Sequence, residues 1–317
     1  MTFPTTHLLG GDIAVPRLGY GAMQLAGRRV IGLPDDVTGA LDVLRAAVDH
    51  GVRFFDTANA YGPRTVNQLI GRALGAVDED LVIGNKVGAW RGPRGEWITD
   101  NRPGFLRTQV EDALLDLRAE VSSLTYLRLP GDGQAPDLDT SQDVPLDEAL
   151  GTLVELRDEG KIRHIGLSGA SPDDLARAQR VTPIAAVQNR FNLIDRSGVE
   201  VLDTCERDGI AFVPFFPLAT GSLGQPDALV RPAVRLGATP STVALAWLLR
   251  RSPVIIPIPG TRSIAHLAEN IHATEIAAQL TDEEVSDLTA VTDESDAALG
   301  VMPERMRDAL QRLIAAP

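Results

Sequence analysis

The sequence predicts an α/β protein built as a (β/α)8 barrel, and three observations support that fold class. Short apolar segments alternate with amphipathic helical patterns eight times along the 317 residues. Several apolar segments are continuously hydrophobic, which is typical of parallel strands covered on both faces. No linker interrupts the alternation, so residues 1–317 are predicted to form one domain. A doubly wound sheet is the alternative, but no Gly-x-Gly-x-x-Gly run follows a first strand.

The predicted elements follow in regular order. Strands are expected at residues 17–20, 52–56, 81–86, 123–128, 162–167, 185–188, 211–215 and 254–258. Helices are expected at residues 36–50, 65–75, 104–118, 146–159, 172–180, 197–208, 240–251 and 264–272. Start signals are Pro34-Asp35-Asp36 for the first, and a capping residue followed by proline at Ser171-Pro172 and Thr239-Pro240. Two apolar runs around Gly10 and Gly11 predict a β-hairpin that plugs the bottom of the barrel, and residues 281–317 predict a C-terminal helical tail.

The composition excludes several classes of binding partner and of cellular location. The formal charge of −13 and the pI near 4.8 argue against a nucleic acid or an anionic membrane as partner. No apolar run approaches the roughly 20 residues of a membrane span, and the N-terminus lacks a secretion pattern. The single cysteine, Cys205, excludes an internal disulfide and fits a reducing cytoplasm, where we expect the protein as a monomer or homo-oligomer. Cys205 is predicted to be a core residue of a helix, and no metal site is expected.

Lys86 stands out because lysine is rare in this chain. Two of the 30 basic residues are lysines, Lys86 and Lys161, so the other 28 are arginines. A lysine that persists at the end of an apolar strand suggests chemistry that a guanidinium cannot perform, since lysine has a compact and titratable charge. A strand-end lysine that points into water is the alternative reading of Lys86 alone.

A possible proton-transfer set is formed by Asp56, Tyr61 and Lys86. Asp56 ends a predicted strand, and Tyr61 follows it in the next loop. A phenol titrates near pH 10, so a neighbouring ammonium that stabilises the phenolate would make tyrosine a better acid, and a carboxylate would orient that ammonium. Taken singly, Asp56 is also a suitable helix N-cap and Tyr61 an ordinary loop aromatic. In a barrel, however, the C-terminal ends of the strands form the active site.

The order of these residues resembles that of an aldo-keto reductase. The run 18–21 (Leu-Gly-Tyr-Gly), Asp56, Tyr61 and Lys86 match the family pattern, and the runs 165–168, 187–189, 258–261 and 269–270 follow in the family's order. The resemblance covers nearly the whole chain. Within the family, the Trp-bracketed loop after Lys86 and the run 127–128 (Leu-Arg) are most similar to the pyridoxal reductase branch, which is also called pyridoxine 4-dehydrogenase.

The resemblance implies an NADPH-dependent reductase of aldehydes or ketones. It assigns the cofactor to residues at several strand ends: Gly21, Ala22, Met23, Asp56, Ser168, Gln188, Phe215, Pro217, Leu218, Gly260, Thr261, Arg262, Ser263, His266, Glu269 and Asn270. Among these, Phe215 would stack on the nicotinamide, and Ser168 and Gln188 would hold its carboxamide. Residues 260–263 with His266 would meet the 2′-phosphate, although Thr261 to Ser263 is also an acceptable helix start. The family's usual asparagine after the serine is Gly169 here.

Arg128 is the main departure from the family pattern. The family usually has a histidine at the end of the fourth strand, and none of the five histidines of this chain lies there. Alignment of residues 121–128 puts Arg128 in that place. A guanidinium can donate hydrogen bonds to a carbonyl oxygen but cannot accept one, so the electrostatic function is kept and a proton relay is lost. An ion pair between Arg128 and Asp132 at the rim is the alternative.

The loop after Lys86 is the region in which we expect contacts with the substrate. Trp90 and Trp97, with arginines between them, can stack on a flat ring or hold an anion, and a loop folded over itself fits equally well. Residues 130–145 are predicted to be a mobile loop or lid. The substrate contacts expected are Tyr61, Trp90 and Arg128, around a small carbonyl compound such as pyridoxal. Two other functions stay open: a nucleotide-binding regulatory protein, and an aldolase or isomerase with Lys86 as Schiff-base nucleophile.

Overall fold

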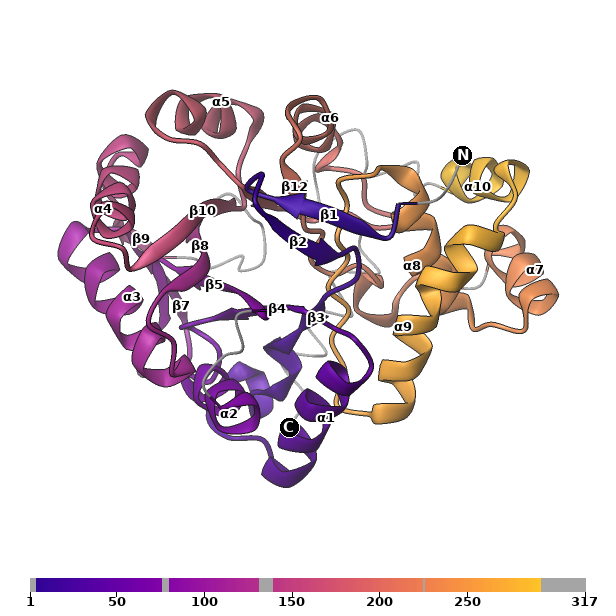
Figure 1. Ribbon diagram of the computed structural model, residues 1–317, viewed down its shortest axis with the longest axis horizontal. Helices are drawn as coiled ribbons and strands as arrows, with labels where there is room; N and C mark the ends of the chain where they lie inside the picture. The colour runs from indigo at the N-terminus through magenta and orange to yellow at the C-terminus, as the bar shows by residue number, and fades with distance from the viewer. Residues whose placement is uncertain (1–3, 76–79, 131–138, 225, 292–317) are drawn as a thin grey trace.

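A sheet of seven parallel strands forms the centre of the computed structural model, which describes residues 4–75, 80–130, 139–224 and 226–291 (Figure 1). Its strand order is β12-β11-β10-β8-β5-β4-β3. Each strand of this sheet therefore pairs with the sheet strand that follows it along the chain. The strands are β3 (Tyr20–Gly21), β4 (Phe54–Ala58), β5 (Val82–Val87), β8 (Ser122–Arg128), β10 (Ile162–Ser168), β11 (Ala186–Gln188) and β12 (Ala211–Phe212). The predicted parallel barrel is therefore confirmed.

The predicted eighth strand, residues 254–258, closes the barrel without forming a regular strand. Its carbonyl groups accept hydrogen bonds from both edges of the sheet: Val254 from Phe212 N at 2.9 Å, and Pro257 from Gly19 N at 2.9 Å. Pro257 lies within the segment, and Pro253 and Pro259 flank it. Proline has no N–H to donate, so a continuous ladder cannot form. The same loss of regularity shortens the predicted strands 17–20 and 211–215 to two residues each, β3 and β12.

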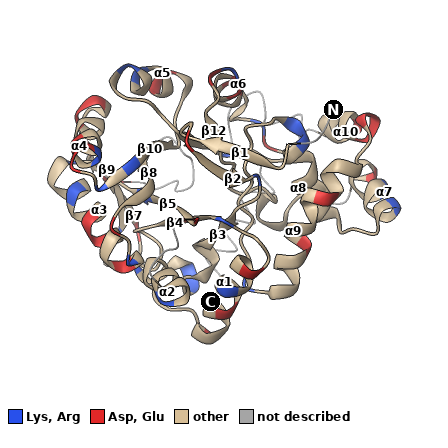
Figure 2. Ribbon diagram, in the orientation of Figure 1, with Lys and Arg blue, Asp and Glu red and all other residues tan. Residues whose placement is uncertain are grey.

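Helices surround the sheet, and many of the Lys, Arg, Asp and Glu positions lie along them (Figures 1 and 2). Those that follow the sheet strands are α1 (Val37–Asp49), α2 (Thr65–Leu74), α3 (Pro103–Leu117), α4 (Leu146–Asp158), α5 (Pro172–Val181), α6 (Val199–Asp208), α8 (Pro240–Arg251) and α9 (Ile264–Gln279). All eight were predicted, but α9 extends past the expected residue 272. A further helix, α7 (Asp227–Leu236), was not predicted. Cys205 lies buried on α6, as expected, and burial raises the pKa of its thiol to about 12.

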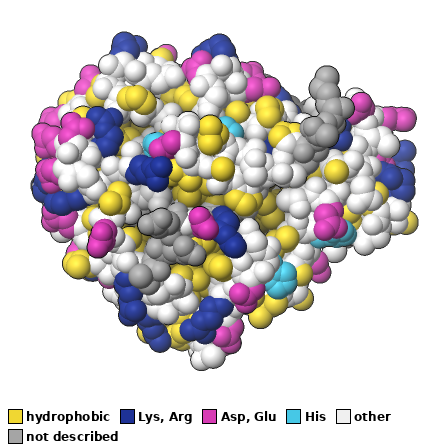
Figure 3. Space-filling model, viewed as in Figure 1, with side chains coloured by type: hydrophobic (Ala, Val, Ile, Leu, Met, Phe, Trp, Pro, Cys, Tyr) yellow, Lys and Arg dark blue, Asp and Glu magenta, His cyan; other side chains and the backbone are white. Residues whose placement is uncertain are grey.

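The N-terminal hairpin consists of β1 (Thr6–Leu9) and β2 (Ile13–Pro16) and crosses one end of the barrel (Figure 1). Leu9 and Val15 are buried among side chains that fill the barrel interior, including Leu124 and Ile256. At the turn, Asp12 pairs with His164 of β10 at 2.7 Å. Figure 3 shows hydrophobic side chains in the middle of this face. The predicted plug of the barrel is therefore confirmed.

A small second sheet lies beside the mouth of the barrel and was not predicted. It joins β6 (Ala89–Arg91), β7 (Trp97–Asp100) and β9 (Asp139–Gln142). Part of the segment 130–145, expected to be a loop, is thus a strand, while Asp132 lies outside the described residues, and so does its expected pairing with Arg128. The predicted helical tail begins with α10 (Asp282–Ala290), and residues 292–317 are not described.

Short 3₁₀ turns complete the mouth: η1 (Ala22–Leu25), η2 (Arg28–Val30) and η4 (Ala219–Gly221). Within the described ranges, no helix is long and apolar enough to cross a membrane. The same part of the chain has no group of three His, Cys, Asp or Glu side chains that could hold a metal ion.

Candidate active site

Five neighbouring strands, β4, β5, β8, β10 and β11, bring the predicted site residues together at their C-terminal ends. Lys86 on β5 lies beside Ala58 of β4, Ser168 on β10 pairs with Arg128 of β8, and Gln188 on β11 pairs with Ser168. The side chains of these strand-end residues and of Asp56 are nearly fully buried. Residues that are 132 positions apart in the sequence thus meet directly, since Gln188 Nε2 donates a hydrogen bond to Asp56 Oδ2 at 2.6 Å.

Lys86 and Asp56 form a buried ion pair. Lys86 Nζ donates to both carboxylate oxygens of Asp56, at 2.6 and 2.8 Å, and to the carbonyl oxygen of Thr57 at 3.1 Å. Burial by itself lowers the pKa of Lys86, but the charges of Asp56 and Tyr61 more than offset it, so the pKa is raised. Lys86 therefore stays an ammonium, held in place by Asp56 as the sequence suggested.

Tyr61 lies in the loop between β4 and α2, and its side chain is 3% exposed. Lys86 Nζ lies 5.1 Å from the centre of the Tyr61 ring. Burial raises the pKa of Tyr61, and this effect exceeds the lowering by Lys86 and Arg128, while Asp56 raises it further. The expected lowering by Lys86 is present, but desolvation outweighs it here. Tyr61 is consequently a protonated hydroxyl at neutral pH, the form that an acid needs.

This burial predicts an unusual alkaline titration. The chain has three tyrosines, Tyr20, Tyr61 and Tyr126, and burial raises the pKa of all of them. We expect the folded protein to show less than one phenolate at about pH 10.5, and three after unfolding in guanidinium, because an exposed phenol titrates near pH 10. Ultraviolet difference titration, with circular dichroism to verify folding, measures this. Full ionisation of one tyrosine near pH 10 in the folded protein would contradict the burial of the site.

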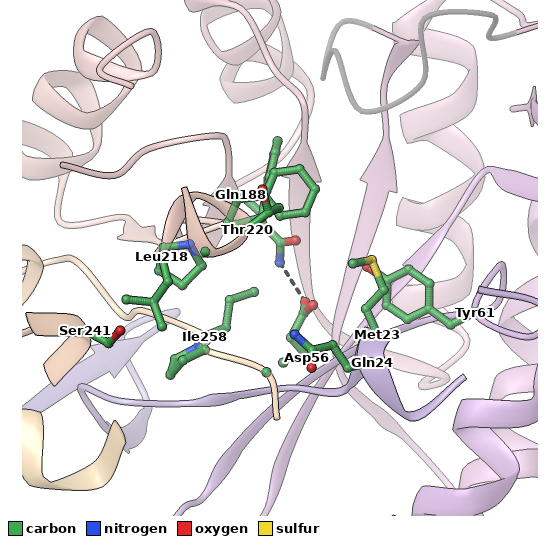
Figure 4. Close-up of a pocket in the computed structure, with 16 residues that line it drawn as sticks. Met23, Gln24, Asp56, Tyr61, Gln188, Leu218, Thr220, Ser241 and Ile258 are labelled. Atoms are coloured by element: carbon green, nitrogen blue, oxygen red, sulfur yellow. Dashed lines mark hydrogen bonds between the residues drawn. The ribbon is translucent and has the colours of Figure 1, made fainter. Parts of the chain in front are cut away.

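A cavity of about 330 Å³ opens beside Asp56 and Tyr61 (Figure 4). Nine of the predicted site residues line it: Gly21, Met23, Asp56, Tyr61, Gln188, Phe215, Pro217, Leu218 and Gly260. The other lining residues were not among the predicted contacts, although the run 258–261 was part of the motif pattern: Gln24, Phe216, Thr220, Gly221, Ser241, Ile258 and Pro259. Phe216 and Thr220 have φ of 53°, a strained backbone for residues other than glycine, which is frequent at binding sites.

Two features of the cavity wall suit a planar polar ligand. Gln188 Oε1 in the wall is buried and has no hydrogen-bond partner among the described residues, and the same is true of Ser168 Oγ, which lies behind the wall on the neighbouring strand β10. Such atoms usually bind a ligand or water. Gly21 and Gly260 approach each other so closely that a Cβ on Gly260 would lie 2.6 Å from Gly21 O. The site therefore has unused hydrogen-bonding capacity at Gln188 and Ser168, and at Gly21 and Gly260 its backbone segments lie too close together for side chains.

The predicted phosphate contacts lie at the N-terminus of α9. Ser263 caps this helix by accepting a hydrogen bond from His266 N, and Thr261 Oγ1 accepts one from Ser263 N at 3.0 Å. Both hydroxyls thus take part in the helix start, which was the alternative reading of this run. Arg262 and His266 are exposed, and Arg262 has no ion-pair partner in the described part of the chain. Farther along α9, Glu269 is exposed and Asn270 is buried.

Arg128 ends β8 and is 1% exposed, with its guanidinium carbon 4.8 Å from the centre of the Trp97 ring. Its charge lowers the pKa of Tyr61, so it acts on the same hydroxyl as Lys86. On the β6–β7 ribbon, Trp90 is opposite Ile98, whereas Arg91 is opposite Trp97. Because side chains alternate between the faces of a strand, Trp90 and Trp97 lie on different faces.

An asparagine network beneath the Tyr61 loop was missed in the sequence. Asn59 Oδ1 accepts hydrogen bonds from Asn85 Nδ2 at 2.8 Å and from Asn67 Nδ2 at 3.3 Å, and Asn59 Nδ2 donates to the carbonyl oxygen of Gln109 at 2.8 Å. These bonds tie the loop that holds Tyr61 to the strand that holds Lys86. The one available signal was Asn85, a polar residue within an apolar run.

Tyr126 was also missed, although it lies directly under the ion pair. Its ring centre is 6.0 Å from Lys86 Nζ and the side chain is fully buried. The ring packs over Gly84 and Gly166, where an added Cβ would lie 2.8 and 2.7 Å from its atoms. Two glycines on the neighbouring strands therefore make room for the aromatic floor of the site.

Comparison with known proteins shows the family of the chain. The Aldo/keto reductase family model matches residues 17–293. The chain is 42% identical over 285 residues to pyridoxine 4-dehydrogenase of Escherichia coli (strain K12), covering 90% of this chain and 97% of that protein. It is 35% identical to an uncharacterised oxidoreductase of Schizosaccharomyces pombe, covering 86% and 85%.

Solved structures of similar shape belong to the same group. A thermostable aldo-keto reductase, Tm1743, in complex with the inhibitor epalrestat superimposes with a TM-score of 0.77 at 29% identity, covering 90% of this chain and 98% of that chain. An aldo-keto reductase from Klebsiella pneumoniae in complex with NADPH gives 0.75 at 25% identity, covering 91% and 94%. With the family model matching most of its length and the barrel and strand-end residues in place, this chain belongs to the aldo/keto reductase family and is an oxidoreductase.

Proposed function

We propose that this protein uses NADPH to reduce an aldehyde or ketone to an alcohol, with a pyridoxal-like flat aldehyde as the favoured substrate. The observation that supports this most is the buried set of Tyr61, Lys86 and Asp56 at the edge of the cavity. The relation to a pyridoxine 4-dehydrogenase supports the substrate class. A structural neighbour crystallised with NADPH supports the cofactor.

The residues of the cavity fit a nicotinamide cofactor. Ser168 Oγ and Gln188 Oε1 would accept hydrogen bonds from the carboxamide N–H groups, which would satisfy two buried atoms that now have no partner among the described residues. Phe215, 5% exposed, would contact the ring face. Gly21 and Gly260 would let the backbone approach the cofactor closely. When bound, the nicotinamide supplies a hydride to the carbonyl carbon.

Residues of this chain supply the proton that the substrate oxygen receives. Tyr61 donates its hydroxyl proton to the carbonyl oxygen as negative charge develops there. Lys86 stabilises the phenolate that Tyr61 becomes, and Asp56 holds Lys86 in position through two hydrogen bonds. Arg128 would add a second positive charge at the carbonyl oxygen. The raised pKa of Lys86 argues against a Schiff-base role, because a nucleophile must be a neutral amine.

A nucleotide-binding regulatory protein with little turnover is the second candidate. Arg128 favours it, because a buried guanidinium replaces the family's histidine and cannot act as a neutral proton donor. The complete set of Asp56, Tyr61 and Lys86 favours the enzyme.

A substrate screen decides between these candidates. Purified full-length protein is mixed with NADPH and a panel of aldehydes and ketones that includes pyridoxal, and loss of reduced-cofactor absorbance is followed. Turnover of any carbonyl compound that depends on Tyr61 supports the reductase. Tight NADPH binding without turnover across the panel would favour the regulatory protein.

Coenzyme choice gives a separate prediction at Arg262. An acidic chain has no long-range attraction for an extra phosphate, so discrimination must come from local contacts. Since the Thr261 and Ser263 hydroxyls take part in the helix start, Arg262 should supply the main contact with the 2′-phosphate. One charge-assisted contact is worth about ten- to a hundredfold in affinity. We expect Arg262→Ala to weaken NADPH binding by that factor and to leave NADH binding nearly unchanged.

Fluorescence titration of both coenzymes measures this effect. Arg231→Ala is a suitable control, because Arg231 is an exposed arginine of α7 that pairs with Asp287. Equal losses for NADPH and NADH in Arg262→Ala would refute a 2′-phosphate role for this residue.

A further inference from the structure

Arg91 is a buried cation with an unused hydrogen-bond donor. Its side chain lies on β6 and the residue is 7% exposed. Nε and Nη2 both donate to the carbonyl oxygen of Gly95, at 3.1 and 2.6 Å. The third nitrogen, Nη1, is buried and has no hydrogen-bond partner among the described residues. A buried N–H that finds no acceptor costs free energy, and the cost is larger on a charged group.

Two other arginines, Arg29 and Arg128, lie close enough to Arg91 to concentrate positive charge around it. The Trp97 ring centre lies 4.3 Å from the guanidinium carbon of Arg91 and 4.8 Å from that of Arg128. Burial, and to a smaller extent the charges of Arg29 and Arg128, lower the pKa of Arg91 to about 10. Among the described residues, Glu96 opposes this with the smallest effect, and Glu96 is itself paired with Arg94. Arg91 and Arg128 are buried and Arg29 is exposed, and positive charge concentrated in this way attracts an anion.

The cluster adjoins the reacting end of the site. Arg128 ends β8, and its charge acts on Tyr61, while Trp97 contacts Arg128 and Arg91 alike. A substrate whose carbonyl oxygen meets Tyr61 could therefore extend a substituent along Trp97 toward Arg91. Guanidinium groups bind carboxylate and phosphate oxygens well, because their N–H groups match the geometry of two oxygens.

We infer that Arg91, braced by Gly95 and stacked on Trp97 beside Arg128, forms an oxyanion-binding subsite for the substrate. The preferred carbonyl compounds then carry a negatively charged oxygen group, such as a carboxylate or a phosphate ester, on the side away from the reacting carbon. This inference rests on the proposed reductase function and specifies its substrate class.

The test compares three aldehydes of similar shape: 4-carboxybenzaldehyde, 4-formylphenyl phosphate and the neutral 4-nitrobenzaldehyde. Because the nitro group alters intrinsic reactivity, the informative quantity is the kcat/KM of each anion divided by that of the nitro compound. In Arg91→Gln we expect at least one of these ratios to fall about tenfold, while kcat/KM for 4-nitrobenzaldehyde changes little. The ratio that falls identifies the oxyanion that the subsite accepts.

Two further variants serve as controls. Arg94→Gln removes an arginine of the same hairpin whose side chain is 91% exposed, and it should leave all ratios unchanged. Arg91→Lys keeps the charge and should restore part of the lost preference. Unchanged ratios in Arg91→Gln, or equal losses with charged and neutral aldehydes, would overturn the subsite.

Binding without turnover separates the subsite from the proposed reaction. Calorimetry of benzoate and phenyl phosphate with the wild type and with Arg91→Gln requires no catalysis. If the wild type reduces none of the aldehydes but binds either anion through Arg91, the reductase proposal fails and the subsite stands. If the aldehydes are reduced and neither the ratios nor anion binding depends on Arg91, the subsite fails and the reductase proposal stands.

Discussion

Replacing Tyr61 with phenylalanine is expected to abolish steady-state carbonyl reduction and to leave NADPH affinity nearly unchanged. The hydroxyl is the group that would protonate the substrate oxygen, and a general acid typically contributes about 10²–10⁴-fold. The phenylalanine ring keeps the packing of a side chain that is 3% exposed. Turnover is measured by loss of reduced-cofactor absorbance, and affinity by quenching of protein fluorescence.

The two measurements of Tyr61→Phe must differ for the assignment to hold. Retention of more than about a tenth of wild-type turnover would show that another group donates the proton. A loss of NADPH affinity as large as the loss of turnover would point to a cofactor contact instead.

Replacing Lys86 should have a comparably large effect. Lys86→Arg is expected to lower turnover about as strongly as Lys86→Met, because a planar guanidinium cannot reproduce the three hydrogen bonds that Nζ makes to Asp56 and Thr57. Lys86→Met also leaves the buried carboxylate of Asp56 without its cation, so its free energy of unfolding should fall by about 3–5 kcal/mol. Urea unfolding measures that loss beside the turnover assay.

Lys161→Arg is the matched control, since Lys161 is the other lysine of the chain. It lies on the surface between Glu111 and Glu159. Arginine can replace it there, because an exposed ion pair contributes little and has no strict geometry. Wild-type turnover in Lys86→Arg would refute the view that lysine persists at this position for its chemistry.

Local pattern was enough to predict the barrel and the residues at its strand ends. The period of apolar residues distinguishes strands from helices, and a continuous apolar run indicates a covered strand. Asp56, Lys86 and Gln188 each end such a run, so the fold class alone puts them on one edge of the sheet. The eighth strand was less regular than predicted because its prolines remove hydrogen-bond donors.

The support of the site depends on contacts that local pattern does not record. Asn59 and Asn67 look like surface residues, and Asn85 is only a polar residue within an apolar run. Yet hydrogen bonds between these side chains join a loop, a helix and a strand. The small sheet of β6, β7 and β9 forms only where segments about 40 residues apart pair side by side. Neither the asparagine network nor the small sheet produces a repeating pattern of apolar residues, so neither can be predicted from the sequence in that way.

By itself, then, the sequence determined the barrel, which follows from periodicity, and the family, which follows from the resemblance of its motifs. It also supplied the strand-end residues that we propose as the reacting groups. Only the tertiary structure decided how those groups are tuned. Burial outweighs the charge of Lys86 and raises the pKa of Tyr61, and Trp97 contacts both Arg91 and Arg128. Desolvation and the sum of nearby charges depend on every element packed around a group, and that packing exists only in the folded chain.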